Sequence, residues 1–245
     1  MAADLTSGIV SRVIDGDTLV LDTGEKIRLA GINSPELAKK NLPAEPLANE
    51  AKSALEGLLV DGRAQVEVAQ EAKDRYGRTL AYLFTPDGQS VQRRLLLDGL
   101  ASVVVISPND RYLREYTAAE DKARKLRRGI WSLSFCRPRS SVIESIAGGY
   151  AFVHGTIEKV ELGDTWFMFK LKADFSIGVL RADWQTNFDY SPWQLEHAEV
   201  VVRGWASRRG TSSRVVVDHP FMLEHCGPDT PRLCPAKVDL TSPTQ

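Results

Sequence analysis

The chain has 245 residues, 43% of them hydrophobic, which is enough for one large core or two small ones and fits two domains of roughly 100 to 140 residues. With 31 Lys and Arg against 32 Asp and Glu, it lacks the basic excess that marks many nucleic-acid-binding proteins, so any contact with a polyanion must be local. No apolar run approaches the roughly 18 to 20 residues that cross a bilayer, so we expect no membrane segment.

The first residues, MAADLTSG, lack the charged and apolar regions of a signal peptide and are typical of a soluble chain. They also fit an exported protein whose signal peptide has been replaced. In that case an exported or periplasmic location is slightly favoured over a cytoplasmic one. The sequence alone leaves the compartment open.

Residues 8–31 predict a small antiparallel meander of three strands, with turn signals at Asp15-Gly16 and Thr23-Gly24. A helical period covers 47–60, where Asp61-Gly62 stops it. The further elements of this half are strands at about 63–70 and 79–84, a helix near 89–98, a strand-like segment at 101–106 and a charged helix at about 110–128. Five strands with interspersed helices indicate one β-rich α+β unit, built on a small barrel of the OB type.

A connector with Ser and Gly, residues 136–149, separates this unit from a second series of strand patterns. These patterns, with a candidate helix at 190–197, lie at 150–162, 165–172, 175–182, 198–207 and 212–219. They predict a second, smaller five-stranded OB-like barrel. We therefore expect domains at 1–135 and 150–226, joined by the linker 136–149 and followed by a Pro-rich, flexible tail at 227–245.

The three cysteines leave the redox state open. Cys226 and Cys234 lie eight residues apart in the segment CGPDTPRLC, where either a loop-closing disulfide or two free thiols would fit. Cys136 is predicted to be unpaired. A zinc site is disfavoured, because no CxxC spacing occurs and only His219 and His225 lie nearby.

Residues suited to phosphate chemistry occur in three short motifs: VIDGDT at 13–18, RLAGINSPE at 28–36 and KDRYGRTLAY at 73–82. The guanidiniums of Arg28 and Arg78 can neutralise a phosphate whose charge grows toward the transition state. The carboxylate of Glu36 can take a proton from the attacking water. Together these groups are typical of phosphodiester cleavage.

Each motif alone has a simpler explanation. Asp15-Gly16-Asp17 is a sequence that hairpin turns favour because it tolerates positive φ. Tyr76-Gly77-Arg78 is consistent with a turn that exposes an arginine, and Asn33-Ser34-Pro35-Glu36 with a loop that its proline restrains. Taken together the motifs favour an active nuclease, because three independent turns seldom supply two arginines, one glutamate and a cation site.

In order and spacing, these motifs resemble the staphylococcal nuclease (thermonuclease) family. The resemblance rests on VIDGDT, on Arg28 followed by GINSPE, on DRYGR, and on a helix that ends before GIWS at 129–132; it covers about residues 8–132. It implies a staphylococcal nuclease-like barrel with three helices as the catalytic domain. The second unit, with VRGW at 202–205 and VVVDHPFMLEH at 215–225, loosely resembles an accessory OB-like domain found behind some bacterial nuclease domains.

The resemblance implies a role for each matching residue. Arg28 and Arg78 would bind the scissile phosphate and stabilise the transition state, and Glu36 would act as general base or position the water. Calcium would be held by Asp17, Asn33 and the backbone carbonyl of Ser34, a set of oxygen ligands that a hard cation prefers. Nucleotide contacts would come from Arg75 and Tyr76. The implied activity is calcium-dependent endonucleolytic cleavage of DNA, with RNA as a second candidate substrate, leaving 3′-phosphate ends.

The sequence departs from the family pattern in two places. Asn33 stands where the family's best-known members have a second calcium-binding Asp, so calcium binding should be weaker, and another divalent ion is an alternative. Val105 and Ser107 stand where those members have tyrosines that stack on a base. Such stacking contributes about 1 to 3 kcal/mol per base, so tight nucleotide binding is not expected.

These departures and the near-neutral charge support an alternative function: a nucleic-acid-binding or assembly protein that keeps the nuclease fold with little or no turnover. The retention of Arg28, Glu36 and Arg78 argues against it. No obligate protein partner is evident from the sequence.

Two further features have a simpler structural explanation. The helix at 110–128 is rich in Lys and Arg near its end, which suits either a phosphate track or a solvated helix C-terminus. Aromatic residues of the second unit could stack on single strands, but core packing is the better interpretation because strand aromatics are mostly interior. They are Trp166, Phe167, Phe169, Trp184 and Trp193.

Overall fold

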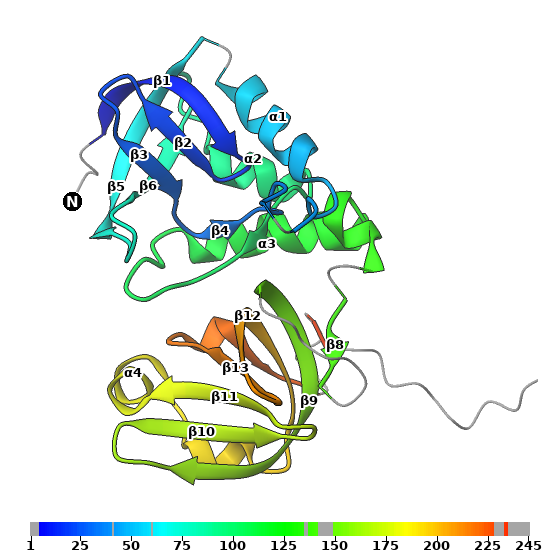
Figure 1. Cartoon of the computed structure of the whole chain (residues 1–245). Coiled ribbons are helices and arrows are strands. Elements are labelled where there is room, and N and C mark those ends of the chain that lie inside the picture. Colours follow the sequence, from blue (N-terminus) through cyan, green and yellow to red (C-terminus); the bar gives the residue numbers. More distant parts are fainter. Residues whose placement is uncertain are drawn as a thin grey trace, which may run out of the picture. The chain divides into compact units, whose positions relative to one another are not determined.

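The computed structural model of the chain describes residues 5–40, 42–59, 61–134, 137–141, 149–227 and 233–234. These residues belong to two compact units, which divide between Phe135 and Cys136 (Figure 1). None of the helices in the described part of the chain is long and apolar enough to cross a membrane.

The first unit is built on a closed five-stranded barrel with the strand order β1-β2-β3-β6-β5. Strands β3 and β6 are parallel to each other, and the other neighbouring pairs are antiparallel. The strands are β1 (Thr6–Asp15), β2 (Thr18–Leu21), β3 (Lys26–Leu29), β5 (Arg63–Lys73) and β6 (Thr79–Phe84). The prediction of an OB-type barrel for this half is confirmed.

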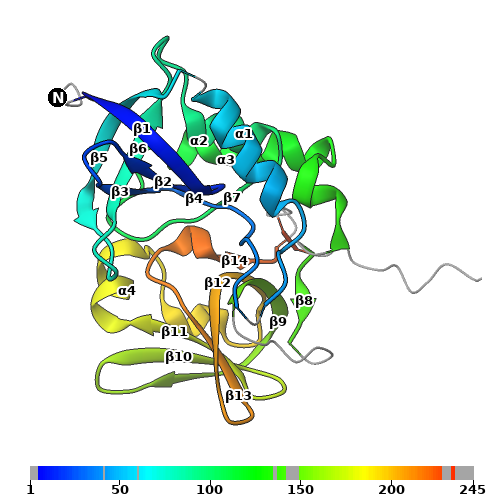
Figure 2. The same cartoon turned by 45° about the horizontal axis from the view of Figure 1, so that its top comes forward.

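Three helices cover this barrel, as predicted: α1 (Ala48–Leu58), α2 (Val91–Leu97) and α3 (Leu113–Lys125). Helix α1 buries Ala48, Ala51 and Leu55, which lie on one face because they are three and four residues apart. That helix lies alongside β1 (Figure 2). It therefore packs next to the turn that follows β1, where the first of the three motifs is located.

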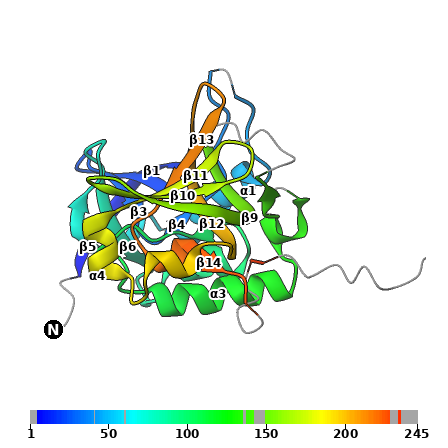
Figure 3. The same ribbon diagram turned by 90° about the horizontal axis from the view of Figure 1, so that it is seen from below.

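The second unit contains a second closed ring of five strands, in the order β9-β10-β11-β13-β12, with β12 pairing back to β9 (Figure 3). The strands are β9 (Gly149–Leu162), β10 (Trp166–Leu171), β11 (Phe175–Leu180), β12 (Glu199–Arg209) and β13 (Ser212–Val216). Strands β11 and β13 are parallel. Both rings thus share one topology, in which the third and fifth strands pair in parallel and a helix follows the third strand. The predicted second OB-like barrel is confirmed.

Several local predictions differ from the structure. The strand pattern at 175–182 ends at Leu180, because helix α4 (Arg181–Asn187) begins there. The strand-like segment at 101–106 contributes only β7 (Ser102–Val103), which pairs with β4 (Ile32–Asn33) outside the barrel. The candidate helix at 190–197 is a short 3₁₀ helix. Its bounds, and those of the other short elements, are Pro192–Leu195, Gly129–Ser132, Pro220–Met222, β8 (Arg139–Ser140) and β14 (Leu223–His225).

Cys226 and Cys234 are joined by a disulfide, so the first of the two alternatives for this pair holds. The bridge fixes Cys234 beside β14, where the carboxylate of Glu224 accepts a hydrogen bond from the backbone of Leu233 at 2.8 Å. Cys136, most of the linker and most of the Pro-rich tail lie outside the described residues.

Candidate active site

The strand register places Arg28 in the middle of three strands. On β3 it pairs with Thr18 of β2 on one side and with Leu80 of β6 on the other. Because β6 begins at Thr79, Arg78 lies just before the neighbouring strand. Two motifs far apart in the sequence therefore meet beside the third.

A buried ion pair joins Arg28 to the turn at Asp15–Asp17, called the DGD turn below. Nη2 of Arg28 lies 3.0 Å from Oδ2 of Asp17 and donates to Oδ1 of Asn33 at 3.3 Å. Its Nη1 donates to the backbone carbonyls of Leu29 and Ile32 at 2.8 and 2.9 Å. These four acceptors hold the guanidinium in one orientation.

The loop after β3 is bonded to the same carboxylate. The backbone N–H of Ser34 donates to Oδ2 of Asp17 at 2.8 Å, and the hydroxyl of Thr18 donates to Oδ1 at 3.0 Å. Asp17, Asn33 and Ser34 are all buried. The structure thus brings Asp17, Arg28, Asn33 and Ser34 together in one buried cluster.

Gly16 of the DGD turn is needed for space and not for its backbone angle. Its φ lies outside the left-handed region, unlike the positive φ that a simple Asp-Gly hairpin would favour. A Cβ at this position would lie 2.6 Å from the Cβ of Ala51 and 2.8 Å from the Cβ and Oγ of Ser34. The missing side chain therefore lets the turn approach α1 and the Ser34 loop closely.

Arg78 is held by a turn that Asp74 organises. Oδ1 of Asp74 accepts from the backbone N–H groups of Tyr76 and Arg78 at 2.9 Å each, and Oδ2 lies 2.7 Å from Nε of Arg78. Burial alone would raise the pKa of Asp74, but the bonds from Arg78 and Tyr76 outweigh it and hold the pKa below its ordinary value. Nη1 of Arg78 is 3.5 Å from the hydroxyl of Thr18, which links it to Asp17.

Glu36 has a fixed backbone and an exposed side-chain partner, Lys39. Its N–H donates to the carboxylate of Glu45 and its carbonyl accepts from the N–H of Glu45, both at 2.9 Å. Its own carboxylate, 46% exposed, lies 2.8 Å from Nζ of Lys39. That bond raises the pKa of Lys39 above its ordinary value, and the nearby charge of Asp15 raises it further. Glu36 thus lies on the loop that Asp17 anchors, but in this structure its carboxylate faces a lysine.

Arg75 and Tyr76 form the exposed side of the site. Tyr76 is 69% exposed, and the guanidiniums of Arg75 and Arg78 lie 4.8 and 5.6 Å from its ring centre. Two cations beside one exposed ring make a surface suited to a nucleotide, with charge for the phosphate and a flat face for the base.

Comparison with known proteins agrees with this geometry. The sequence pattern of the family described as "Staphylococcal nuclease homologue" matches residues 26–133. The chain is 38% identical over 128 residues to the thermonuclease of Staphylococcus intermedius. The aligned region covers 51% of this chain and 76% of that protein. The chain belongs to the staphylococcal nuclease homologue family. Endonuclease YncB of Bacillus subtilis (strain 168) is 36% identical over 135 residues, covering 53% of this chain and 64% of that protein. The first unit is thus a nuclease domain of that family, followed by a second barrel that these matches do not cover.

Asp15 gives this family site a second carboxyl group, which is half-buried. Its pKa is raised to about 6, first by burial and then by the charge of Asp17, although the bond that it accepts from the backbone N–H of Asp17 partly offsets this. Two carboxylates held this close favour either a proton or a bound cation between them.

The donor set of the site fits a hard divalent cation. Asp17, Asn33, Asp15 and the backbone carbonyl of Ser34 supply only oxygen atoms, which Ca²⁺ and Mg²⁺ prefer to nitrogen or sulfur. Among the described residues no cluster of three or more His, Cys, Asp or Glu forms a metal site, so carboxylates alone would not complete the coordination. Arg28 also shares the Asp17 carboxylate, so a cation would have to coordinate beside it.

The departures from the family pattern have structural consequences. Val105 is buried, so it offers no exposed face to a base.

The charged helix predicted at 110–128 uses two of its cations in packing. Arg111 bonds Glu67 at 2.8 Å, and Arg124 lies over the ring of Trp131. Both cations are thus engaged in packing the helix, which agrees with the structural interpretation of that charge.

Sequence reasoning assigned no role to Thr18, Asp74 or Lys39. Thr18 connects Asp17 to Arg78, Asp74 fixes the turn of Arg78, and Lys39 bonds Glu36. Only Asp74 had a visible signal: an Asp four residues before the Arg, with Gly between them, is typical of a turn whose carboxylate accepts from its own backbone.

Proposed function

We propose that the chain is a calcium-dependent endonuclease that hydrolyses phosphodiester bonds of DNA, leaves 3′-phosphate ends and has RNA as a second candidate substrate. The observation that carries the proposal is the convergence of Asp17, Arg28, Asn33 and Ser34 in one buried cluster, linked to Arg78 through Thr18. Membership of a nuclease family supports the same activity.

Both arginines keep donors for a phosphate. None of the described residues accepts a hydrogen bond from Nε of Arg28 or from Nη2 of Arg78, and neither atom is sealed from solvent. The bonds that their other nitrogens make fix the two guanidiniums before substrate arrives. Fixed cations stabilise the developing charge of a pentacoordinate phosphorus without the cost of reorganising at the moment of reaction.

Glu36 is the proposed general base. Its backbone is fixed by Glu45, while its half-exposed carboxylate is bonded only to Lys39 among the described residues, so a change of rotamer can bring it to a water beside the phosphate. A surface ion pair of this kind contributes roughly 0 to 1 kcal/mol, so it opposes that movement weakly. The water then attacks phosphorus opposite the departing 5′ oxygen, and Glu36 takes its proton.

Asp17, Asn33 and the Ser34 carbonyl are the proposed calcium ligands, with Asp15 behind them. A bound cation would supply charge stabilisation at the phosphate and orient the nucleophilic water. The neutral Asn33 removes one negative charge from this set, so we expect millimolar rather than micromolar calcium to be needed.

The test is cleavage of single-stranded DNA with calcium or with a chelator, using the reference protein, Arg78→Ala, and Arg94→Ala as the matched control. Arg94 is a surface arginine that also pairs with an Asp four residues away, at 2.9 Å. We expect chelator to abolish cleavage and Arg78→Ala to reduce it at least 100-fold, with Arg94→Ala unchanged. Products that run faster before phosphatase treatment would carry the proposed terminal phosphate. A cleavage rate that is unchanged both by chelator and by Arg78→Ala would contradict the proposal.

Two observations favour a second candidate, a nucleic-acid-binding or assembly protein without useful turnover. The carboxylate of the proposed base is bonded to Lys39, and Asn33 lowers the charge of the proposed cation site. Calcium titration followed by calorimetry separates the two: no saturable binding at millimolar calcium, together with no cleavage of plasmid or RNA, would favour the binding protein.

A further inference from the structure

The outer surface of the second barrel has a row of polar residues that crosses five strands. The register pairs Lys159 of β9 with Lys170 of β10, Lys170 with Ser176 of β11, Ser176 with Arg214 of β13, and Arg214 with Ser207 of β12. We call these five residues the cross-strand row. Cations and hydroxyls supply most of the hydrogen-bond donors that a chain of phosphates needs.

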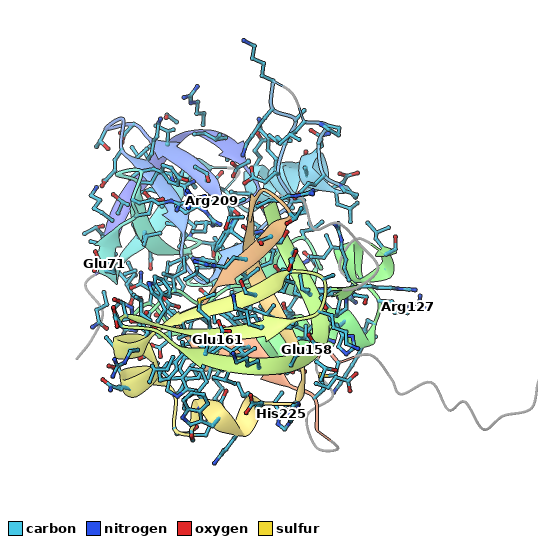
Figure 4. The ribbon with its side chains drawn as sticks, turned by 60° about the horizontal axis from the view of Figure 1, so that its bottom comes forward. Glu71, Arg127, Glu158, Glu161, Arg209 and His225 are labelled. Carbon is cyan, nitrogen blue, oxygen red and sulfur yellow. A yellow bond between two sulfur atoms is a disulfide. The ribbon has the colours of Figure 1, made fainter. Side chains whose placement is uncertain are left out.

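The cross-strand row faces away from the barrel core, and four of its five side chains are at least partly exposed, whereas Ser176 at its centre is covered by its neighbours and is 7% exposed. Its neighbours along the strands, one residue away, are Phe169, Ile177, Val215 and Ala206, which are 0%, 0%, 0% and 6% exposed. Because side chains alternate between the two faces of a sheet, the row must lie on the opposite face. Figure 4 labels Glu161 and Arg209 among the side chains of this barrel, which come from β9 and the end of β12.

Apolar side chains lie beside the row. Two residues further along β11 is Gly178, and the three nearest atoms to a Cβ there would belong to Met168, Trp166 and Arg214, at the van der Waals distances of 3.5, 3.5 and 3.7 Å. A glycine inside a strand gives up packing, and such positions often mark the close approach of another chain or a ligand. The apolar side chains around Gly178 continue on the neighbouring strands with Val216 and Trp205, which are 50% and 41% exposed.

The charge of this face is positive, although the unit as a whole is not. Residues 141–245 contain 10 Lys and Arg against 13 Asp and Glu. On the face itself, Lys159 and Lys170 share one carboxylate, Glu161, at 3.2 and 3.8 Å. Arg214 has no carboxylate partner among the described residues, and the exposed Arg209 extends the charge beyond the row. The other nearby acids are Glu158, at the bulge of β9, and the exposed Asp174, two residues before Ser176. The cations Lys159, Lys170, Arg209 and Arg214 still outnumber these two carboxylates and Glu161.

We propose that the outer surface of the second barrel binds a single strand of nucleic acid that follows the cross-strand row around the closed ring, with phosphates along the row and bases against Met168, Trp166 and Trp205. Lys170 and Arg214 are separated by one strand, so their backbones are roughly 10 Å apart, a distance that successive phosphates of an extended strand can bridge. The exposed ion pair between Lys170 and Glu161 is weak, so phosphate can replace Glu161.

The apolar half of the face distinguishes a single strand from a duplex. Unpaired bases can stack on exposed aromatic and sulfur-containing side chains, whereas a duplex keeps its base faces hidden and offers only phosphates. Binding here needs no cleavage, so the inference goes beyond the proposed function and does not depend on it.

The test measures binding of a fluorescent 20-nucleotide deoxythymidine strand to the full chain by anisotropy, as a function of salt. The Glu36→Gln background is used to keep the strand intact, which a denaturing gel checks. In that background Lys170→Gln/Arg214→Gln is compared with Lys172→Gln/Arg181→Gln, an equal loss of charge at two exposed positions of the same unit outside the row. We expect the first pair of substitutions to lower affinity at least 10-fold and the second pair to lower it less than 2-fold. In the first pair, the slope of log affinity against log salt concentration should also be smaller by about 1.4. A ribouridine strand should behave in the same way.

Photo-crosslinking of a 4-thiothymidine strand, followed by peptide mapping, gives a second measurement that remains valid if the strand is cut. Crosslinks in β10, β12 or β13 are the expected result. The proposal is overturned by unchanged affinity in Lys170→Gln/Arg214→Gln, by an equal loss in the control pair, by crosslinks confined to the first unit, or by equally tight, row-dependent binding of a duplex.

Discussion

Asp74 and Arg78 form an ion pair of 2.7 Å within a single turn, and the same carboxylate accepts the backbone N–H of Arg78 at 2.9 Å. The side chain and the backbone of the arginine are therefore positioned by one residue. Among the described residues, the hydroxyl of Thr18 is what links the Arg78 side chain to Asp17 of the DGD turn.

Asp74→Asn should lower kcat about 10-fold with a smaller change in KM, because the neutral amide holds the guanidinium less firmly and the loss falls mainly on the transition state. Steady-state cleavage of single-stranded DNA measures both constants. Asp98→Asn is the matched control, since Asp98 forms the same kind of pair with Arg94 on the surface, at 2.9 Å. Equal effects of the two substitutions on kcat would show that Asp74 does not position Arg78 for catalysis.

Gly16→Ala should destabilise the protein by roughly 2 to 4 kcal/mol, because its methyl group would overlap Ala51 and Ser34, which are fixed by a helix and by Asp17. Urea unfolding monitored by tryptophan fluorescence gives the free energy. Gly57→Ala is the control: this glycine lies within α1 with nothing within 4 Å of an added Cβ, so the substitution should be neutral or stabilising. Neutral behaviour of Gly16→Ala would mean that the turn can move away from α1.

Asp15→Asn should stabilise the metal-free protein at pH 8 and have little effect at pH 4. The folded pKa of about 6 lies above the ordinary 3.8, so the folded state binds the proton more tightly than the unfolded state. Stability is therefore lost as pH rises from about 4 through 6, and Asn, which cannot ionise, avoids a loss on the order of 2 kcal/mol. Urea unfolding in the presence of chelator at both pH values measures the difference in the free energy of unfolding between Asp15→Asn and the reference protein. The exposed Asp22→Asn is the control. A constant difference at all pH values would contradict the assignment.

How far the sequence predicts this molecule depends on the kind of interaction. Both barrels were predictable, because alternation and turn residues are local signals, and the clustering of Arg28 with Asp17 followed from a motif order that matches a known family. The strand predicted over 175–182 failed at Leu180, since a buried apolar run does not show where α4 begins. The Lys39 partner of Glu36 and the cross-strand row were not predictable, because both depend on side-chain rotamers or register between distant segments.

The role of Gly16 was also not predictable, because it depends on a contact with a distant part of the sequence. The Asp-Gly pair predicts a turn, and a turn is present between β1 and β2. The reason for the glycine is Ala51, 35 positions later in the chain, which no local pattern contains.

Asn33→Asp should raise calcium affinity about 10-fold, because a second carboxylate would join Asp17 at the proposed cation site while its oxygen could still accept from Arg28. Isothermal titration with calcium in the absence of nucleic acid measures the change. Gln89→Glu, which adds the same charge at an exposed position on the first unit, is the control. Equal gains in both variants would indicate a general charge effect rather than a ligand at position 33.

The role proposed for Glu36 is to take the proton of the attacking water at the Arg28 and Arg78 site. Its most direct test is the single-turnover cleavage rate of Glu36→Gln at saturating single-stranded DNA and calcium, with Glu50→Gln on α1 as the matched control. We expect a rate at least 100-fold below the reference for Glu36→Gln, with DNA affinity within about 3-fold and no effect of the control. A single-turnover rate equal to that of the reference protein would contradict the account.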